Sequence, residues 1–174
     1  MTVYVWSDLH LAHKSICQYR PQFKTVAEHD AWIVQQYLKV IHKRDKIFLL
    51  GDIAIRFAGL NIIKELPGYK HLVLGNHDLE RGPQFADLVG IYDKVDSMVK
   101  YKNLWLTHAP IHPDELRGKK NVHGHCHRHI LNDKRYINVC VEHADRPIPI
   151  EEIINGNFQT YTRSSDINAV TDRV

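Results

Sequence analysis

The chain has 174 residues, of which 44% are hydrophobic and 25% are charged, and its formal net charge is +3. This length suits a single domain with a substantial core, and the composition excludes disordered and collagen-like chains. No apolar run is long enough to cross a membrane, and the basic residues form no dense cluster that would indicate a nucleic-acid surface.

The first half of the chain alternates predicted strands and helices. Residues 2–6, 46–50 and 71–74 are apolar runs that read as strands, and each leads into a loop that carries aspartate or histidine. A helix is predicted from Thr25, which has the capping-box spacing with Glu28, and a shorter helix over residues 60–66. In open α/β sheets ligands bind beyond the carboxyl ends of the strands, so we expect these loops to converge.

The second half is richer in predicted strands. They cover residues 95–101, 103–107, 121–123 and 136–141, with a turn at Asn132-Asp133 before the last strand, and a short helix follows over residues 150–154. Residues 164–174 are polar and lack a periodic pattern, so we expect a loosely ordered tail. Without a repeat or linker, residues 1–174 are predicted to form a single domain.

The contents of cysteine and histidine indicate the environment and the cofactor. The chain has three cysteines, an odd number, and is large enough to be stable without disulfide bonds, which favours a reducing compartment. Because the N-terminus also lacks a basic and apolar leader, we expect a cytoplasmic protein. Thirteen histidines are unusually many, and their clustering with carboxylates and glycines favours metal binding.

Five short motifs combine these residues, mostly at predicted strand ends. Each is weakly specific alone, because Asp-x-His and Gly-Asp arise by chance in many proteins. A single histidine is usually an ordinary residue of the core or the surface. Gly-x-His-x-His is more informative, since alternate residues of an extended segment point the same way and can bind a metal. The motifs are Asp8-Leu9-His10, Gly51-Asp52, Gly75-Asn76-His77-Asp78, Thr107-His108-Ala109-Pro110 and Gly124-His125-Cys126-His127.

In this order the motifs resemble those of the calcineurin-like metallophosphoesterase superfamily, and the run from Ser7 to His13 also resembles its small stand-alone bacterial and phage members. The resemblance implies a mixed α+β or α/β fold, a four-layer sandwich in which two mixed β-sheets are flanked by helices. It also implies two divalent metal ions that share Asp52. The implied ligands are Asp8, His10, Asp52 and His127 for the first ion, and Asp52, Asn76, His108 and His125 for the second.

Manganese is the expected metal, with iron, zinc, nickel or magnesium as alternatives, because imidazole with carboxylate and amide oxygens does not suit calcium. The resemblance implies a phosphoesterase in which a metal-bound hydroxide attacks phosphorus. Asp52 would serve catalysis as the shared ligand, and Asn76 would lie at the substrate. His77 would protonate the leaving oxygen or donate a hydrogen bond to the phosphate.

One departure from the family pattern concerns the residue that orients His77. In the protein-phosphatase branch the second motif reads Gly-Asp-x-x-Asp-Arg, and the later aspartate orients the catalytic histidine. Here Ile55 replaces that aspartate, which leaves Asp78 or another group to take its place. Arg56 stands where that branch keeps a phosphate-contacting arginine, so it is either a substrate-binding residue or an ordinary surface arginine.

Two further residues, one within the last motif and one close to the first, are interpreted from their positions in the sequence. Cys126 alternates between two predicted ligands and is expected to face away from the metals into the core. His13 follows the first ligand loop, where it either contacts substrate or begins a solvated helix.

The sequence therefore predicts a phosphoesterase that hydrolyses a phosphodiester, or a phosphomonoester, of a small molecule or nucleotide. The missing aspartate and the small size favour a diester. Two alternatives stay open: a DNA-repair nuclease, which usually carries a further DNA-binding domain, and a non-catalytic scaffold that keeps the metals, which is expected to have lost some ligands.

Overall fold

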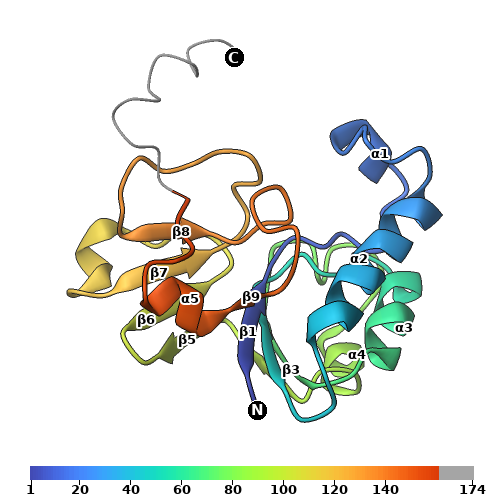
Figure 1. Ribbon diagram of the computed structural model, residues 1–174. Coiled ribbons are helices and arrows are strands. Elements are labelled where there is room, and N and C mark those ends of the chain that lie inside the picture. Colours follow the sequence, from blue (N-terminus) through green and yellow to red (C-terminus); the bar gives the residue numbers. More distant parts are fainter. Residues whose placement is uncertain (161–174) are drawn as a thin grey trace.

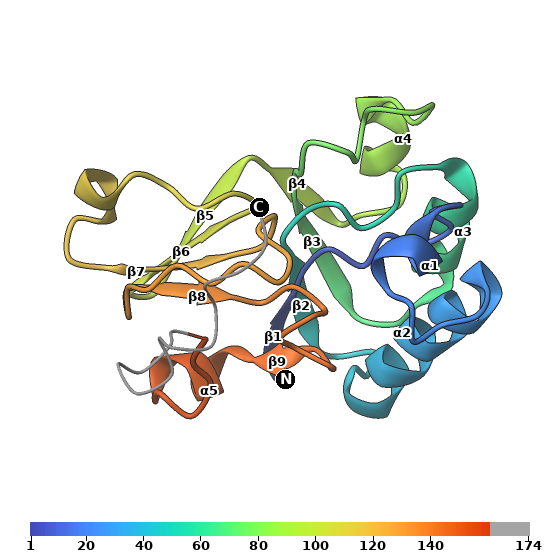
Figure 2. The same ribbon diagram turned by 90° about the horizontal axis from the view of Figure 1, so that it is seen from above.

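The computed structural model describes residues 1–160, and the predicted tail at residues 164–174 lies outside them. Two mixed β-sheets pack against each other and are flanked by helices (Figures 1 and 2), so the predicted fold class is confirmed. The first sheet has the strand order β4-β3-β2-β1-β9, in which β1 to β4 are parallel. Its strands are β1 Val3–Trp6, β2 Lys46–Leu49, β3 Tyr69–Val73, β4 Lys94–Asp96 and the antiparallel β9 Ile148–Pro149.

The second sheet has the order β5-β6-β7-β8, with β6, β7 and β8 parallel and β5 antiparallel to β6. The chain also forms two further short helical segments, the 3-10 helix η1 (Pro113–Leu116) and the helix α5 (Ile150–Ile154). The strands are β5 Met98–Tyr101, β6 Leu104–Thr107, β7 Lys120–His123 and β8 Tyr136–Asn138.

Four helices cover the side of the first sheet that faces away from the second sheet (Figure 2). The predicted N-cap is confirmed, because Thr25 Oγ1 accepts a hydrogen bond from the backbone N–H of Glu28 at 3.1 Å. The carboxylate of Glu28 in turn accepts a hydrogen bond from the backbone N–H of Lys24, the residue that precedes the N-cap. The helices are α1 Ile16–Tyr19, α2 Val26–Val40, α3 Phe57–Glu65 and α4 Phe85–Val89.

The strand predicted over residues 95–101 is wrong as a single element. It is broken at Ser97, so that β4 pairs with β3 in the first sheet while β5 pairs with β6 in the second. Alternation of apolar and polar residues reports burial of one face and says nothing about the partner strand. The turn at Asn132-Asp133 likewise joins the parallel strands β7 and β8, so it does not close a hairpin.

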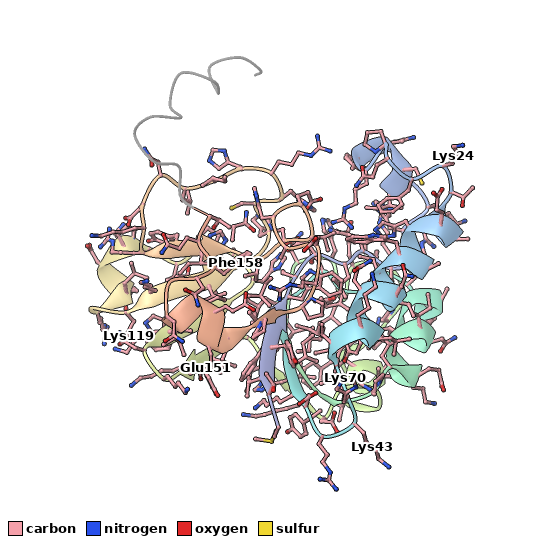
Figure 3. The ribbon with its side chains drawn as sticks, viewed as in Figure 1. Lys24, Lys43, Lys70, Lys119, Glu151 and Phe158 are labelled. Atoms are coloured by element: carbon pink, nitrogen blue, oxygen red, sulfur yellow. The ribbon has the colours of Figure 1, made fainter. Side chains whose placement is uncertain are left out.

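A single apolar core joins the two sheets and the helices. Val5 and Leu72 of the first sheet, Val122 of the second and Ile33 of α2 belong to one cluster of buried residues. Charged side chains such as Lys24 and Lys43 stay on the outside (Figure 3). None of the helices within residues 1–160 combines the length and apolarity that a membrane span requires.

Candidate metal centre and adjoining cleft

The predicted ligands follow the carboxyl ends of strands from both sheets. Two groups of side chains have ligand atoms that lie within 4.8 Å of one another, and each group joins the two halves of the chain. The backbone N–H of Asp8 donates to the carbonyl of Gly51 at 3.1 Å, and that of His10 donates to Asp52 at 3.0 Å, so the loops after β1 and β2 are held together. The first cluster is Asp8, His10 and His127, and the second is Asp52, His108 and His125.

In the second cluster, Asn76 adds a fourth ligand atom to the three of the group. Its Oδ1 lies 2.9 Å from His108 Nε2 and 3.0 Å from His125 Nδ1, and the two ring nitrogens are 3.2 Å apart. Asp52 Oδ2 lies 3.4 Å from His108 Nε2. Ligand atoms at about 2 Å from one ion are about 3 to 4 Å from each other, so this set of two oxygens and two nitrogens fits one transition-metal ion.

The first cluster leaves buried polar atoms without hydrogen-bond partners. Asp8 Oδ1 is buried and unpartnered in the described chain, as are both ring nitrogens of His10. His10 Nε2 and His127 Nε2 lie 3.8 and 3.7 Å from this oxygen, too far for hydrogen bonds but suited to three ligands around one ion. Buried polar atoms without partners cost free energy, and a bound cation would provide a partner for the unpaired atoms of Asp8 and His10.

Most of the predicted ligands have strained backbones. Within residues 1–160, eight residues other than glycine have positive φ angles, and five of the eight are predicted ligands. Such conformations cost on the order of 1 kcal/mol or more each and persist where the surrounding structure enforces them, often at functional sites. The five are Asp8 (φ 57°), His10 (51°), Asp52 (54°), His125 (66°) and His127 (46°).

Two motif glycines permit the close approach of the ligand loops. A Cβ on Gly75 would overlap the carboxylate of Asp52, and a Cβ on Gly124 would overlap Ser7 Oγ and Asp8 Oδ2. Gly124 thus lets the loop after β7 lie directly on the loop after β1, where the backbone N–H of His125 donates to Asp8 Oδ2 at 2.9 Å. Gly124 is therefore needed for contact between the two halves, whereas Gly75 permits contact between the loops after β2 and β3 within the first half.

Charge pairing within the two clusters shifts the pKa values of their buried ligands. Burial raises the pKa of Asp8, but the imidazoles of His10 and His108 and the hydroxyl of Ser7 hold it well below its usual range. Burial would lower the pKa of His108, yet the neighbouring Asp52 raises it to about 9. In the absence of metal, a proton on His108 therefore compensates part of the negative charge that a cation would compensate.

Hydrogen bonds on the far side of two imidazoles select the nitrogen that faces each cluster. His108 Nδ1 lies 2.8 Å from the carbonyl of Leu50, to which it donates, and this leaves Nε2 for the cluster. His127 Nδ1 lies 3.2 Å from Glu142 Oε1, with the same consequence for its Nε2. Metal-binding histidines commonly have such partners, which fix the ring and the tautomer.

Comparison with known proteins agrees with this geometry. Residues 1–142 match the model of the calcineurin-like phosphoesterase superfamily domain. The chain belongs to this superfamily. The motifs read from the sequence had indicated the same family.

Relatives of this phosphoesterase domain occur in phages. The chain is 31% identical over 190 residues to the Gene 66 protein of Mycobacterium phage L5, with 84% of this chain and 89% of that protein covered. It is 25% identical to the Gene 66 protein of Mycobacterium phage D29, with coverages of 86% and 93%. The crystal structure of the protein of unknown function AQ665 from Aquifex aeolicus is similar, with a TM-score of 0.71, 27% identity, and coverages of 88% and 98%.

In this chain the side-chain partner of His77 is Glu80. The carboxylate of Glu80 contacts His77 Nδ1 from one turn further along the chain. The backbone N–H of His77 donates to Asp52 Oδ1 at 2.8 Å, and its Nε2 lies 4.0 Å from Asp52 Oδ2. Asp78, the candidate named from the sequence, instead accepts backbone N–H bonds from Asp52, Ile53 and Gly75 and so ties the ligand loops together.

A cleft of about 710 Å³ opens beside the first cluster. Its lining includes His10, His77 and His127, and the cleft is large enough for a ligand the size of a nucleotide. The lining also includes aromatic and cationic side chains, and the backbone carbonyl of Tyr19 accepts a hydrogen bond from Arg128 Nη2 at 3.1 Å. The further lining residues are His13, Ile16, Gln18, Tyr19, Ile55, Glu80, Arg81, Cys126, Arg128, His129 and Glu142.

Two sequence expectations fit this cleft poorly. Arg56 is the half-buried N-cap residue of α3 and lies outside the lining, whereas Arg81 and Arg128 are part of it. Cys126 lines the cleft, so its expected place in the core is wrong. The left-handed backbone at His125 and His127 breaks the extended geometry on which that expectation relied.

Besides Arg81 and Arg128, the sequence analysis missed three residues that contact the side chains or loops of the site. Glu80 could have been found, since it follows His77 at the i, i+3 spacing that brings side chains together in a helical turn. Arg20 and Glu142 have no such signal, because Glu142 lies 15 residues from His127 and 122 from Arg20. Only the folded chain brings them together.

Proposed function

We propose that this protein hydrolyses a phosphodiester, or a phosphomonoester, of a small molecule or nucleotide with two divalent cations at the two clusters. When bound, the cations would supply an activated water nucleophile and neutralise charge on the phosphoryl oxygens. Asp8, His10 and His127 would hold one cation, and Asn76, His108 and His125 the other, with Asp52 shared between them. Manganese is the proposed metal, since the donors suit it and its neighbours in the transition series.

The observation that carries this proposal is the convergence of two buried aspartates with four imidazoles in two compact groups. Both aspartates are almost fully buried, at 0% and 1% exposure, and one buried carboxylate oxygen lacks a partner. Five strained ligand backbones, two of them at residues that line the cleft, are difficult to explain by stability alone.

The other residues of the cleft have distinct roles in this proposal. His77, 39% exposed at its side chain and facing the cleft, would protonate the leaving oxygen. Glu80 at its Nδ1 would orient the ring so that Nε2 faces the reacting phosphate. Arg81 and Arg128 are better placed than Arg56 to contact the substrate, and the open cleft leaves room for the second ester group of a diester.

The test is hydrolysis of bis-para-nitrophenyl phosphate by metal-free protein before and after addition of manganese. We expect turnover only with manganese, and removal of the metal by a chelator should abolish it. A screen of cyclic nucleotides, nucleotide monoesters, dinucleoside polyphosphates and oligonucleotides then defines the substrate. Two bound manganese ions without turnover of any of these esters would contradict the proposal and favour a scaffold, and preference for oligonucleotides would favour the nuclease.

A further inference from the structure

A buried arginine joins the first cluster to the rest of the molecule. Arg20, which directly follows α1, is only 1% exposed. Its Nη2 donates to the carbonyl of Asp8 at 2.6 Å, and its Nη1 donates to that of Leu9 at 3.2 Å. These carbonyls belong to the loop in which Asp8 and His10 adopt left-handed backbones, so Arg20 supports the loop at its strained part.

The same guanidinium also holds the partner of a ligand from the other half of the chain. Arg20 Nε donates to Glu142 Oε1 at 3.0 Å, and this oxygen lies 3.2 Å from His127 Nδ1. The side chain of Glu142 is 9% exposed, whereas that of His127 is 44% exposed. Glu142 is therefore a fixed group against which a more accessible imidazole is oriented.

Arg20 is itself held from α2. His29 Nε2 lies 2.8 Å from Arg20 Nη1, and His29 Nδ1 lies 2.8 Å from Asp30 Oδ1. The other oxygen of Asp30 accepts the backbone N–H of Ala12 at 3.0 Å, in the same loop as the ligands. The network thus connects His127, through Glu142 and Arg20, with the loop that carries Asp8 and His10.

We propose that Arg20 and Glu142 are positioning residues of the first metal site. Arg20 sets the backbone that presents Asp8 and His10, and Glu142 sets the ring and tautomer of His127, so that three ligands from both halves meet at one point. Neither residue binds the metal. The inference rests on the proposed function only in requiring that the first cluster holds a cation. Carboxylate partners of metal-bound imidazoles have this role in other metalloproteins.

The experiment is a calorimetric titration of metal-free protein with manganese, which measures each site without reference to catalysis. The wild type is expected to bind two ions. Glu142→Gln keeps the size of the side chain and should weaken one of the two sites by about 10- to 100-fold while the other is unchanged. Glu152→Gln is the matched control, because Glu152 pairs with Arg146 at 2.9 Å on the same C-terminal segment but away from the cleft.

Two further variants make the result specific. If Glu142→Gln does not fold because Arg20 is left unpaired, the double variant Arg20→Gln with Glu142→Gln removes both charges and should again lose one site selectively. In a His127→Ala background, Glu142→Gln should cause little additional weakening, because Glu142 acts through His127. At saturating manganese, Glu142→Gln should recover most of its kcat.

The possible outcomes distinguish failure of this inference from failure of the proposed function. A folded Glu142→Gln protein that binds both ions as the wild type does would overturn this inference and leave the proposed function intact. Equal weakening of both sites would also overturn it, since the contacts of Glu142 reach only the first cluster. A wild-type protein that binds no manganese would overturn the proposed function as well.

Discussion

The two halves of the molecule contribute different chemistry to the candidate site. The half built on the first sheet supplies all of the oxygen ligands, on Asp8, Asp52 and Asn76, whereas the half built on the second sheet supplies imidazoles alone. The carboxylates are buried, while His125 is exposed and His127 is partly so. The first half thus provides buried negative charge, and the second half completes two sites that neither half contains alone.

The contact surface between the two halves, here called the seam, is held by specific hydrogen bonds and close backbone contacts. Trp6 Nε1 donates to the carbonyl of Ala144 at 2.7 Å, and Ser7 forms a parallel bridge with Cys140. Gly124 has no room for a Cβ against Ser7 and Asp8. Ligand geometry here therefore depends on the packing between the sheets as much as on either ligand loop, and five changes test this dependence.

The largest effect is expected where the shared carboxylate is neutralised. Asp52→Asn keeps the shape of the side chain but removes the charge that attracts both cations, so kcat/KM should fall on the order of a thousandfold or more. Metal analysis should show fewer than two ions per chain. Retention of both ions and of activity would show that the first half does not supply the essential charge.

His77→Ala separates proton transfer from metal binding. We expect both ions to be retained and kcat to fall about 100- to 1000-fold, because the leaving oxygen loses its proton donor. The measurement pairs steady-state kinetics with metal content. Loss of metal together with activity would mean that His77 is part of a metal site.

Gly124→Ala tests the seam directly. The added methyl group overlaps Ser7 and Asp8, so we expect a loss of about 1 to 3 kcal/mol in the free energy of unfolding, measured by urea denaturation. Gly90→Ala is the control, because a Cβ there meets neighbours only at 3.6 Å or beyond and φ is −77°. Equal stability of the two variants would contradict the tight contact between the halves.

The pH dependence of the metal-free protein tests the charge pairing between the halves. The pKa of His108 is raised from 6.5 to about 9 by Asp52, so its contribution is complete below pH 6.5 and is lost as pH rises through about 9. Chelator-treated protein should lose on the order of 1 to 3 kcal/mol of stability over this interval. His108→Gln should flatten the curve, and a wild-type stability that rose with pH would exclude the pairing.

The smallest effect is expected at the edge of the cleft. Glu80→Gln removes the charged partner of His77, but both side chains are about 40% exposed, and solvent screens the attraction between them. We therefore expect kcat to fall by up to about fivefold, with KM and metal content unchanged. In a His77→Ala background the same substitution should have no effect on kcat, and a persisting effect would assign Glu80 another role.

The local elements and the chemistry of the motifs could be predicted from the sequence. Apolar runs predicted β1, β2 and β3, the Thr25 cap predicted the start of α2, and the order of the motifs identified the phosphoesterase superfamily. These features are local or are carried by short patterns, so they can be read before the chain is folded.

The tertiary structure alone decided how the pieces meet. It divided residues 95–101 between two sheets. It placed the carboxylate of Glu80, and not that of Asp78, against the ring of His77. It also brought Arg20 and Glu142 together next to the first cluster. The physical reason is that periodicity records which face is buried and motifs record which groups are present. Contacts between Arg20 and Glu142, 122 residues apart, arise only from the packing of the two sheets.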